Sequence, residues 1–120
     1  MIVVDASAML EALGGGIAAP HLLDVQVLSA LRGLVLGGKL DAPGAEWARE
    51  EYFGFAIDRY EIAPLSDRIW ELRHRFTSYD AGYIALAEAL DAPLHTCDAK
   101  LERGHRAAIR LTPRTPSSAP

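Results

Sequence analysis

Hydrophobic positions along the chain fall into short apolar runs and into segments with helical spacing. The run "MIVV" at the start predicts a buried strand that ends at Asp5, and "APLHTC" predicts a later strand that ends at Asp98. Between them, Leu23, Val27, Leu31 and Leu34 recur with the spacing of one helix face, which predicts a helix over about 22–36. Strands that alternate with helices predict an α/β fold with a parallel sheet flanked by helices.

Local signals bound the other elements. "ASAMLEAL" (6–13) predicts a short helix that the glycines at 14–16 end, and "IAAP" predicts a brief extended piece. Asp41 can cap a helix over about 42–55, and Thr77 or Ser78 can cap "YDAGYIALAEAL". "DRYEIAP" predicts a connecting or extended segment, "LSDRIWELRHRF" (65–76) an amphipathic helix, "AKLER" a helical turn and "AAIRL" an edge strand. The tryptophans at 47 and 70 are expected to pack.

The composition is that of one soluble globular domain. Half of the residues are hydrophobic and 23% are charged. No apolar run reaches the roughly 18 residues of a membrane span. The start lacks the basic region of a signal peptide, and the single cysteine, Cys97, excludes a disulfide framework, so a cytoplasmic location is expected. We expect one domain over 1–111, followed by a Pro/Ser-rich disordered tail over 112–120.

Charge is distributed unevenly. Residues 1–98 carry 7 Lys/Arg and 15 Asp/Glu, a net charge of −8, whereas residues 99–120 carry 5 Lys/Arg and one acid, a net charge of +4. The basic end, which includes Arg103, Arg106 and Arg110, is either a solvated tail or an edge that contacts phosphates.

Three acidic residues stand out by their positions. Each has a structural explanation, because Asp5 and Asp98 could cap the segments that follow them and Asp80 could favour the positive end of its helix. Together, however, acids at the carboxyl ends of parallel strands would meet in one crevice and repel each other. A divalent cation relieves that repulsion, and an all-oxygen ligand set suits Mg²⁺ or Mn²⁺. Such an ion can activate water without a Ser or Cys nucleophile.

Four blocks, "IVVDASAML", "HLLDVQVLSALR", "TSYDAGYIALAEAL" and "APLHTCDAKL", resemble the signature blocks of the PIN domain, and more narrowly the VapC toxins of bacterial VapBC toxin–antitoxin modules. The resemblance implies a PIN-like three-layer fold and a Mg²⁺- or Mn²⁺-dependent endoribonuclease toxin, of a kind that often acts on structured RNA such as tRNA. It also implies a homodimer and neutralisation by a VapB-type antitoxin. Carried over by position, the metal-binding and catalytic acids are Asp5, Asp80 and Asp98, with Ser7 and Thr96 as supporting hydroxyls.

The chain departs from the family pattern at Gln26, where the family normally presents a Glu. On a helical wheel Gln26 lies beside the small residues Ser29, Ala30 and Gly33, whereas Asp24 falls about 160° away and cannot easily substitute. The amide is either a weak or supporting metal ligand or a hydrogen-bonded core amide. The segment 14–20 is also shorter than in relatives, which normally carry there a helix that helps to form the antitoxin groove.

Several functions remain open at this point. An active ribonuclease toxin is the first, and an attenuated or inactive relative that retains antitoxin binding is the second. A receiver-like phosphoacceptor domain ranks far behind, because no acid pair ends the first strand and no lysine clearly follows a late strand. An Asp-x-Asp phosphatase is disfavoured because position 7 is Ser.

Overall fold

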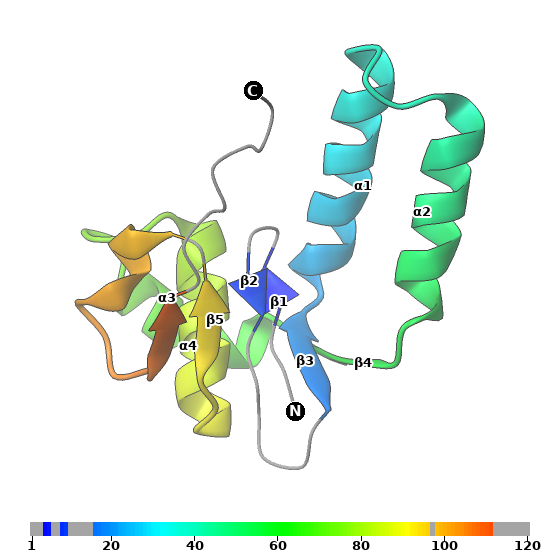
Figure 1. The fold of residues 1–120 in the computed structure, drawn as a ribbon. Helices are drawn as coiled ribbons and strands as arrows, with labels where there is room; N and C mark the ends of the chain where they lie inside the picture. Colours follow the sequence, from blue (N-terminus) through cyan, green and yellow to red (C-terminus); the bar gives the residue numbers. More distant parts are fainter. Residues whose placement is uncertain (1–3, 6–7, 10–15, 97, 112–120) are drawn as a thin grey trace.

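The computed structural model describes residues 4–5, 8–9, 16–96 and 98–111; the side chains of residues 4–5 and 8–9 lie outside this description, as do Ser7, Cys97 and the predicted tail over 112–120. Strands and helices alternate along the chain, as the hydrophobic pattern predicted (Figure 1). The elements are β1 (Val4–Asp5), β2 (Ala8–Met9), β3 (Ile17–Pro20), α1 (Leu22–Leu36), α2 (Ala42–Gly54), β4 (Ile57–Tyr60), η1 (Ala63–Leu65), α3 (Ser66–Glu71), α4 (Ser78–Leu90), β5 (Leu94–Thr96), η2 (Ala99–Glu102) and β6 (Ile109–Leu111).

Parallel pairing joins strands that are far apart in sequence. β3 pairs with β4 from Ile17–Ile57 to Pro20–Tyr60, and β5 pairs with β6 from Leu94–Ile109 to Thr96–Leu111. β1 contacts both β3 and β5, and Figure 1 shows it between them. The predicted α/β class with parallel strands is therefore confirmed.

Four elements follow their local sequence signals closely. The helix predicted from leucine and valine spacing is α1, and the predicted extended piece "IAAP" is β3. The Asp41 carboxylate accepts the Gly44 N–H at 2.8 Å and caps α2, and the Thr77 hydroxyl accepts the Asp80 N–H at 3.1 Å and caps α4. Each of the two caps acts within one helical turn of the chain, so it does not depend on the rest of the fold.

Two predicted helices were wrong in type or extent. Within the expected helix over 6–13, Ala8 and Met9 form β2, which pairs antiparallel with β1. A helix of eight residues is marginal by itself, so pairing with a neighbouring strand can prevail. The expected helix over 65–76 is shorter: α3 ends at Glu71, and the chain then turns so that Phe76 packs on His105 with 5.8 Å between ring centroids.

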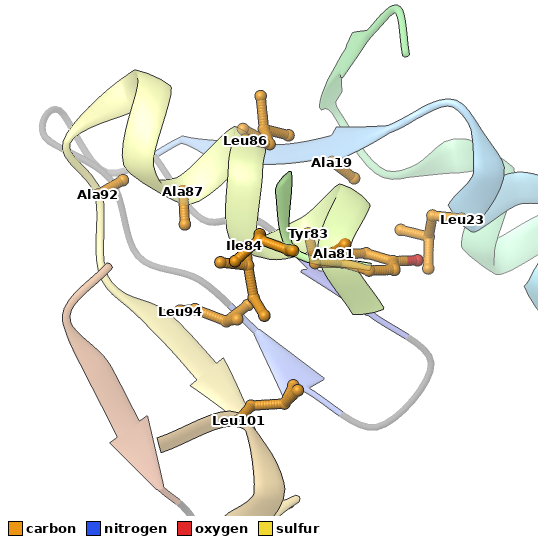
Figure 2. Packing of buried hydrophobic residues seen from close by; sticks show 12 residues of the cluster. Ala19, Leu23, Ala81, Tyr83, Ile84, Leu86, Ala87, Ala92, Leu94 and Leu101 are labelled. Atoms are coloured by element: carbon orange, nitrogen blue, oxygen red, sulfur yellow. The ribbon is translucent and has the colours of Figure 1, made fainter. Parts of the chain in front are cut away.

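Helix α4 is the centre of the hydrophobic core. Seven consecutive residues, from Ala81 to Ala87, are buried, so the helix is covered on all sides. Figure 2 shows Ile84 beside Leu94 of β5, and the Tyr83 ring directed towards Leu23 of α1. A Cβ atom at Gly82 would lie 3.2 Å from Leu22 Cδ2, so the small residue permits the close approach of α1 to α4.

Helices α1 and α2 form a hairpin that projects from the rest of the molecule (Figure 1). Its base is fixed by Asp24, which accepts hydrogen bonds from Tyr52 Oη at 2.9 Å and Arg59 Nε at 2.7 Å. Trp47 on α2 and Trp70 on α3 are 66% and 67% exposed, so the expectation that they pack was wrong. A largely apolar groove between the two helices is called here the hairpin groove. Its lining consists of Leu28, Leu31, Val35, Leu36, Ala42 and Ala45, together with the charged residues Arg32, Glu46 and Arg49.

A buried ion pair fastens the far end of α4. The Glu88 side chain is 6% exposed and accepts hydrogen bonds from Arg68 Nε at 2.6 Å and Nη2 at 2.9 Å. It also accepts the backbone N–H of Arg106 at 2.6 Å. Glu88 therefore joins α3, α4 and the segment that leads into β6.

Among the described helices, none has the length and apolar character needed to cross a bilayer.

Candidate active site

Asp80 lies in the first turn of α4, where Thr77 fixes its backbone N–H. Asp98 lies two residues after the end of β5. Its N–H donates to the Thr96 hydroxyl at 3.0 Å, and its Oδ1 accepts the Lys100 N–H at 2.9 Å. A threonine hydroxyl thus fixes the backbone of each aspartate. Thr96, which binds the Asp98 N–H, is buried, whereas Thr77, which binds the Asp80 N–H, is exposed. Both carboxylates are half-buried.

The two carboxylates interact electrostatically. Burial and the negative charge of Asp98 both raise the pKa of Asp80, while Thr77 and the positive charge of Lys100 act in the opposite direction. The structure therefore brings Asp80 on α4 and Asp98 after β5 close enough to interact, and their role as metal ligands remains a prediction. Lys100 beside them was predicted only as part of the basic end.

Asp5 is the last residue of β1, and β1 contacts β5, the strand that leads to Asp98. Its side chain lies outside the described residues, as does Ser7, so their part in the site remains a prediction. Among the side chains that the structure describes, no three His, Cys, Asp or Glu residues gather as a metal site. A third carboxylate for the predicted site would have to come from Asp5.

The residues present fit a hard divalent cation. Asp80 and Asp98 offer only oxygen donors, which Mg²⁺ and Mn²⁺ prefer. The raised pKa of Asp80 reflects its burial first and the negative charge of Asp98 second, and a bound cation would favour the ionised form against both.

Gln26 has a partner that the helical wheel could not reveal. Its Oε1 accepts a hydrogen bond from the Tyr83 hydroxyl, 57 positions away in the sequence. Tyr83 lies three residues after Asp80 on α4, so the amide borders the same helix face one turn further along. Asp24 is bound to Tyr52 and Arg59 instead, in agreement with the prediction that it cannot replace Gln26. The signal for this contact was the tyrosine in "YDAGY", three residues after the aspartate.

Proteins with open α/β sheets bind their ligands at the carboxyl ends of parallel strands. The acidic side chains beside the end of β5 place this chain in that class. Comparison with family models finds no match. Comparison with individual proteins finds close similarity to ribonuclease VapC9 of Mycobacterium tuberculosis, which is 41% identical over 123 residues, covering 93% of this chain and 97% of the relative.

Two further relatives from Mycobacterium tuberculosis agree. Ribonuclease VapC1 is 41% identical over 115 residues, covering 82% of this chain and 86% of the relative. Ribonuclease VapC12 is 32% identical over 127 residues, covering 92% of this chain and 98% of the relative. The chain therefore belongs to the VapC ribonuclease family.

Proposed function

We propose that this chain is the endoribonuclease toxin of a type II toxin–antitoxin module and that it hydrolyses RNA phosphodiester bonds with a metal-activated water. The observation that carries the proposal is the paired Asp80 and Asp98 at the start of α4 and the end of β5, in a chain 41% identical to proteins named as ribonucleases. Family membership removes the support for a receiver-like domain. Action in the cytoplasm and on tRNA remain predictions.

In the proposed site, Asp80 and Asp98, together with Asp5, would hold Mg²⁺ or Mn²⁺. When bound, such an ion lowers the pKa of a water and polarises a phosphate oxygen. The chain's own groups orient the site: Thr77 and Thr96 each accept the backbone N–H of one aspartate, which fixes the backbone that carries the carboxylate. Lys100 adds a positive charge that attracts the phosphate of the substrate.

Gln26 favours the second candidate, an attenuated relative that retains antitoxin binding. Its side chain brings no charge to the site, and its oxygen already accepts the Tyr83 hydroxyl. Both candidates share the same partner. We infer that the hairpin groove receives an apolar helix face of a VapB-type antitoxin, because a groove between two helices that is lined by leucine, valine and alanine suits that mode of binding. A homodimer remains a prediction.

Cleavage of RNA by the purified chain tests the proposal directly. We expect cleavage in Mn²⁺ or Mg²⁺, none in EDTA, and none with Asp5→Asn although that variant keeps its fold. Cleavage that continues in EDTA would exclude the metal-dependent mechanism. An Asp5→Asn variant with full activity would exclude Asp5 from the site. Folded wild-type protein that lacks cleavage but binds the antitoxin would establish the second candidate.

A further inference from the structure

The cations on the segments that flank α4 differ in whether a carboxylate already binds them. Arg68 and Arg106 are bound to Glu88. By contrast, Arg75, Lys100 and Arg103 are exposed, and none of them forms an ion pair with a carboxylate of the described residues. Their charges are therefore available for an anion from outside the chain.

Gly104 brings two of these cations together. Its φ is +95°, and a Cβ atom there would lie 3.0 Å from Arg75 Cδ and 3.1 Å from Arg75 Nη1. The Arg75 side chain therefore lies against the backbone next to Arg103, and Phe76 packs on His105 beside the same junction. This contact joins the loop before α4, which carries Asp80, to the segment after η2, which follows Asp98. The Arg75 side chain and the backbone beside Arg103 therefore meet at one junction, five residues before Asp80 and five residues after Asp98 along the chain.

Tyr79 is an exposed aromatic residue at the start of the helix that carries Asp80. It directly precedes Asp80 in the first turn of α4, and it is 63% exposed although it is a large hydrophobic residue. Exposed aromatic rings beside positive charges are the usual means by which proteins bind unpaired nucleotides, because the ring stacks on a base while the cations contact phosphates.

We propose that Tyr79 stacks on an unpaired base of the RNA while Arg75 and Arg103 contact the phosphates that flank the bond to be cut. The inference rests on the proposed ribonuclease function and adds the residues that hold an unpaired stretch of the RNA. A paired segment fits poorly, because the faces of its bases are covered by stacking within the A-form helix.

The stacking is tested by RNA binding in EDTA, where cleavage does not interfere. The probe is a fluorescein-labelled, U-rich, unstructured RNA of about 12 nucleotides, a length within the usual range of single-strand sites. We expect Tyr79→Ala to weaken its binding by about tenfold or more and Tyr79→Phe to bind nearly as the wild type does, because stacking needs the ring and not the hydroxyl. Trp47→Ala is the matched control, since Trp47 is equally exposed on α2, and its binding should equal that of the wild type.

The phosphate contacts are tested by the salt dependence of the same binding. Each of Arg75→Gln and Arg103→Gln should weaken binding and reduce the slope of log K against log salt by about 0.7, the value for one single-strand phosphate. Lys39→Gln, an exposed cation in the turn between α1 and α2, should leave the slope unchanged.

The possible results separate this inference from the function on which it rests. If Tyr79→Ala binds as the wild type does, or loses no more than Trp47→Ala, the stacking role is overturned although cleavage by the wild type is intact. Equal affinity for the unstructured RNA and for the same RNA in a duplex would also overturn it. Wild-type protein that cleaves no RNA in Mn²⁺ would instead contradict the proposed function, whatever the binding results.

Discussion

Asp80 is a residue whose charge is unfavourable in the metal-free protein. Burial and the charge of Asp98 raise its pKa above that of an ordinary aspartate, so the ionised form is less favoured in the folded than in the unfolded chain. The free energy of unfolding therefore falls as pH rises from the ordinary value through the raised folded value. Groups that keep an unfavourable charge are common at functional sites.

The unfavourable charge of Asp80 gives a prediction for Asp80→Asn. Cleavage should fall by at least about a hundredfold, because a metal ligand matters more than the outer groups that cost 10- to 100-fold. At neutral pH the melting temperature of the metal-free variant should rise rather than fall, and Mn²⁺ should no longer raise it further. Thermal melts with and without Mn²⁺, beside a cleavage assay, measure both effects. Asp67→Asn, an exposed acid in the first turn of α3, is the control and should change neither.

Gln26→Glu should have the opposite effect on metal affinity. A fourth carboxylate near the cation is worth about 4 kcal/mol at 4 Å for an effective dielectric constant of 20, before desolvation is subtracted. A net gain of about 1.4 kcal/mol would tighten metal binding tenfold. The carboxylate can still accept the Tyr83 hydroxyl, so the contact between α1 and α4 should survive. We expect faster cleavage, lower stability without metal and a larger stabilisation by Mn²⁺.

A neutral variant completes that experiment. Gln26→Met keeps the length of the side chain but cannot accept the Tyr83 hydroxyl, so it should lose stability without any gain from Mn²⁺. If Gln26→Glu and the wild type show equal Mn²⁺-induced shifts and equal rates, Gln26 is a structural amide outside the metal site.

Helices with local signals were predictable, and contacts between distant elements were not. Asp41 and Thr77 cap their helices within one turn, and the spacing of Leu23 and Val27 predicted α1. The segment of β4 was predicted only as connecting or extended, because its partner β3 lies forty positions earlier. Likewise, the strand-end pattern predicted the place of Asp98, whereas Asp80 on its helix was assigned to the site through the family resemblance. The partner of Gln26 depended on how α1 packs against α4.

The Glu88 ion pair is the contact on which three elements depend. Burial disfavours the charged carboxylate, but the hydrogen bonds from Arg68 and from the Arg106 backbone outweigh that cost and hold the pKa of Glu88 below 4.5. A lowered folded pKa means that the stabilisation is complete above pH 4.5 and is lost as pH falls through the folded value. Glu88→Gln leaves Arg68 with only the exposed Glu71 carboxylate, 3.5 Å away, as an anionic partner, which should cost about 3 kcal/mol.

That loss is measurable as a change in melting temperature. For a domain of this size, about 3 kcal/mol corresponds to a decrease of roughly 10 °C at neutral pH. The difference between the variant and the wild type should shrink as pH falls through the lowered pKa of folded Glu88, because the wild-type carboxylate then becomes protonated. Glu46→Gln breaks the exposed pair with Arg49 on α2 and should change nothing measurable. Equal changes in the two variants would show that burial of Glu88 adds no stability.

The molecule as a whole separates its polar site from its apolar surface. The acidic pair and the free cations lie around the start of α4, whereas the hairpin groove lies on α1 and α2, which project from the body (Figure 1). Because different elements carry these two surfaces, a substitution in the groove should change partner binding without changing RNA cleavage.

Leu28→Glu tests this separation against a control on the same helix. Leu28 lines the hairpin groove and is 42% exposed, whereas Leu34 is 41% exposed but is not among the residues that line the groove. A glutamate at 28 would place a charge against the apolar face of the antitoxin, so its affinity should fall by about 30-fold or more, the loss typical of a hot-spot residue worth about 2 kcal/mol. Leu34→Glu should bind as the wild type does, and both variants should cleave RNA at the wild-type rate.

The measurement is titration of each variant with the purified product of the adjacent upstream gene, where a VapB-type antitoxin is expected. The titration gives the affinity, and RNA cleavage in the presence of the antitoxin shows how much of each variant escapes neutralisation. Equal losses of affinity in the two variants would place the antitoxin elsewhere, and loss of cleavage with Leu28→Glu would mean that the groove and the acidic site form one coupled surface.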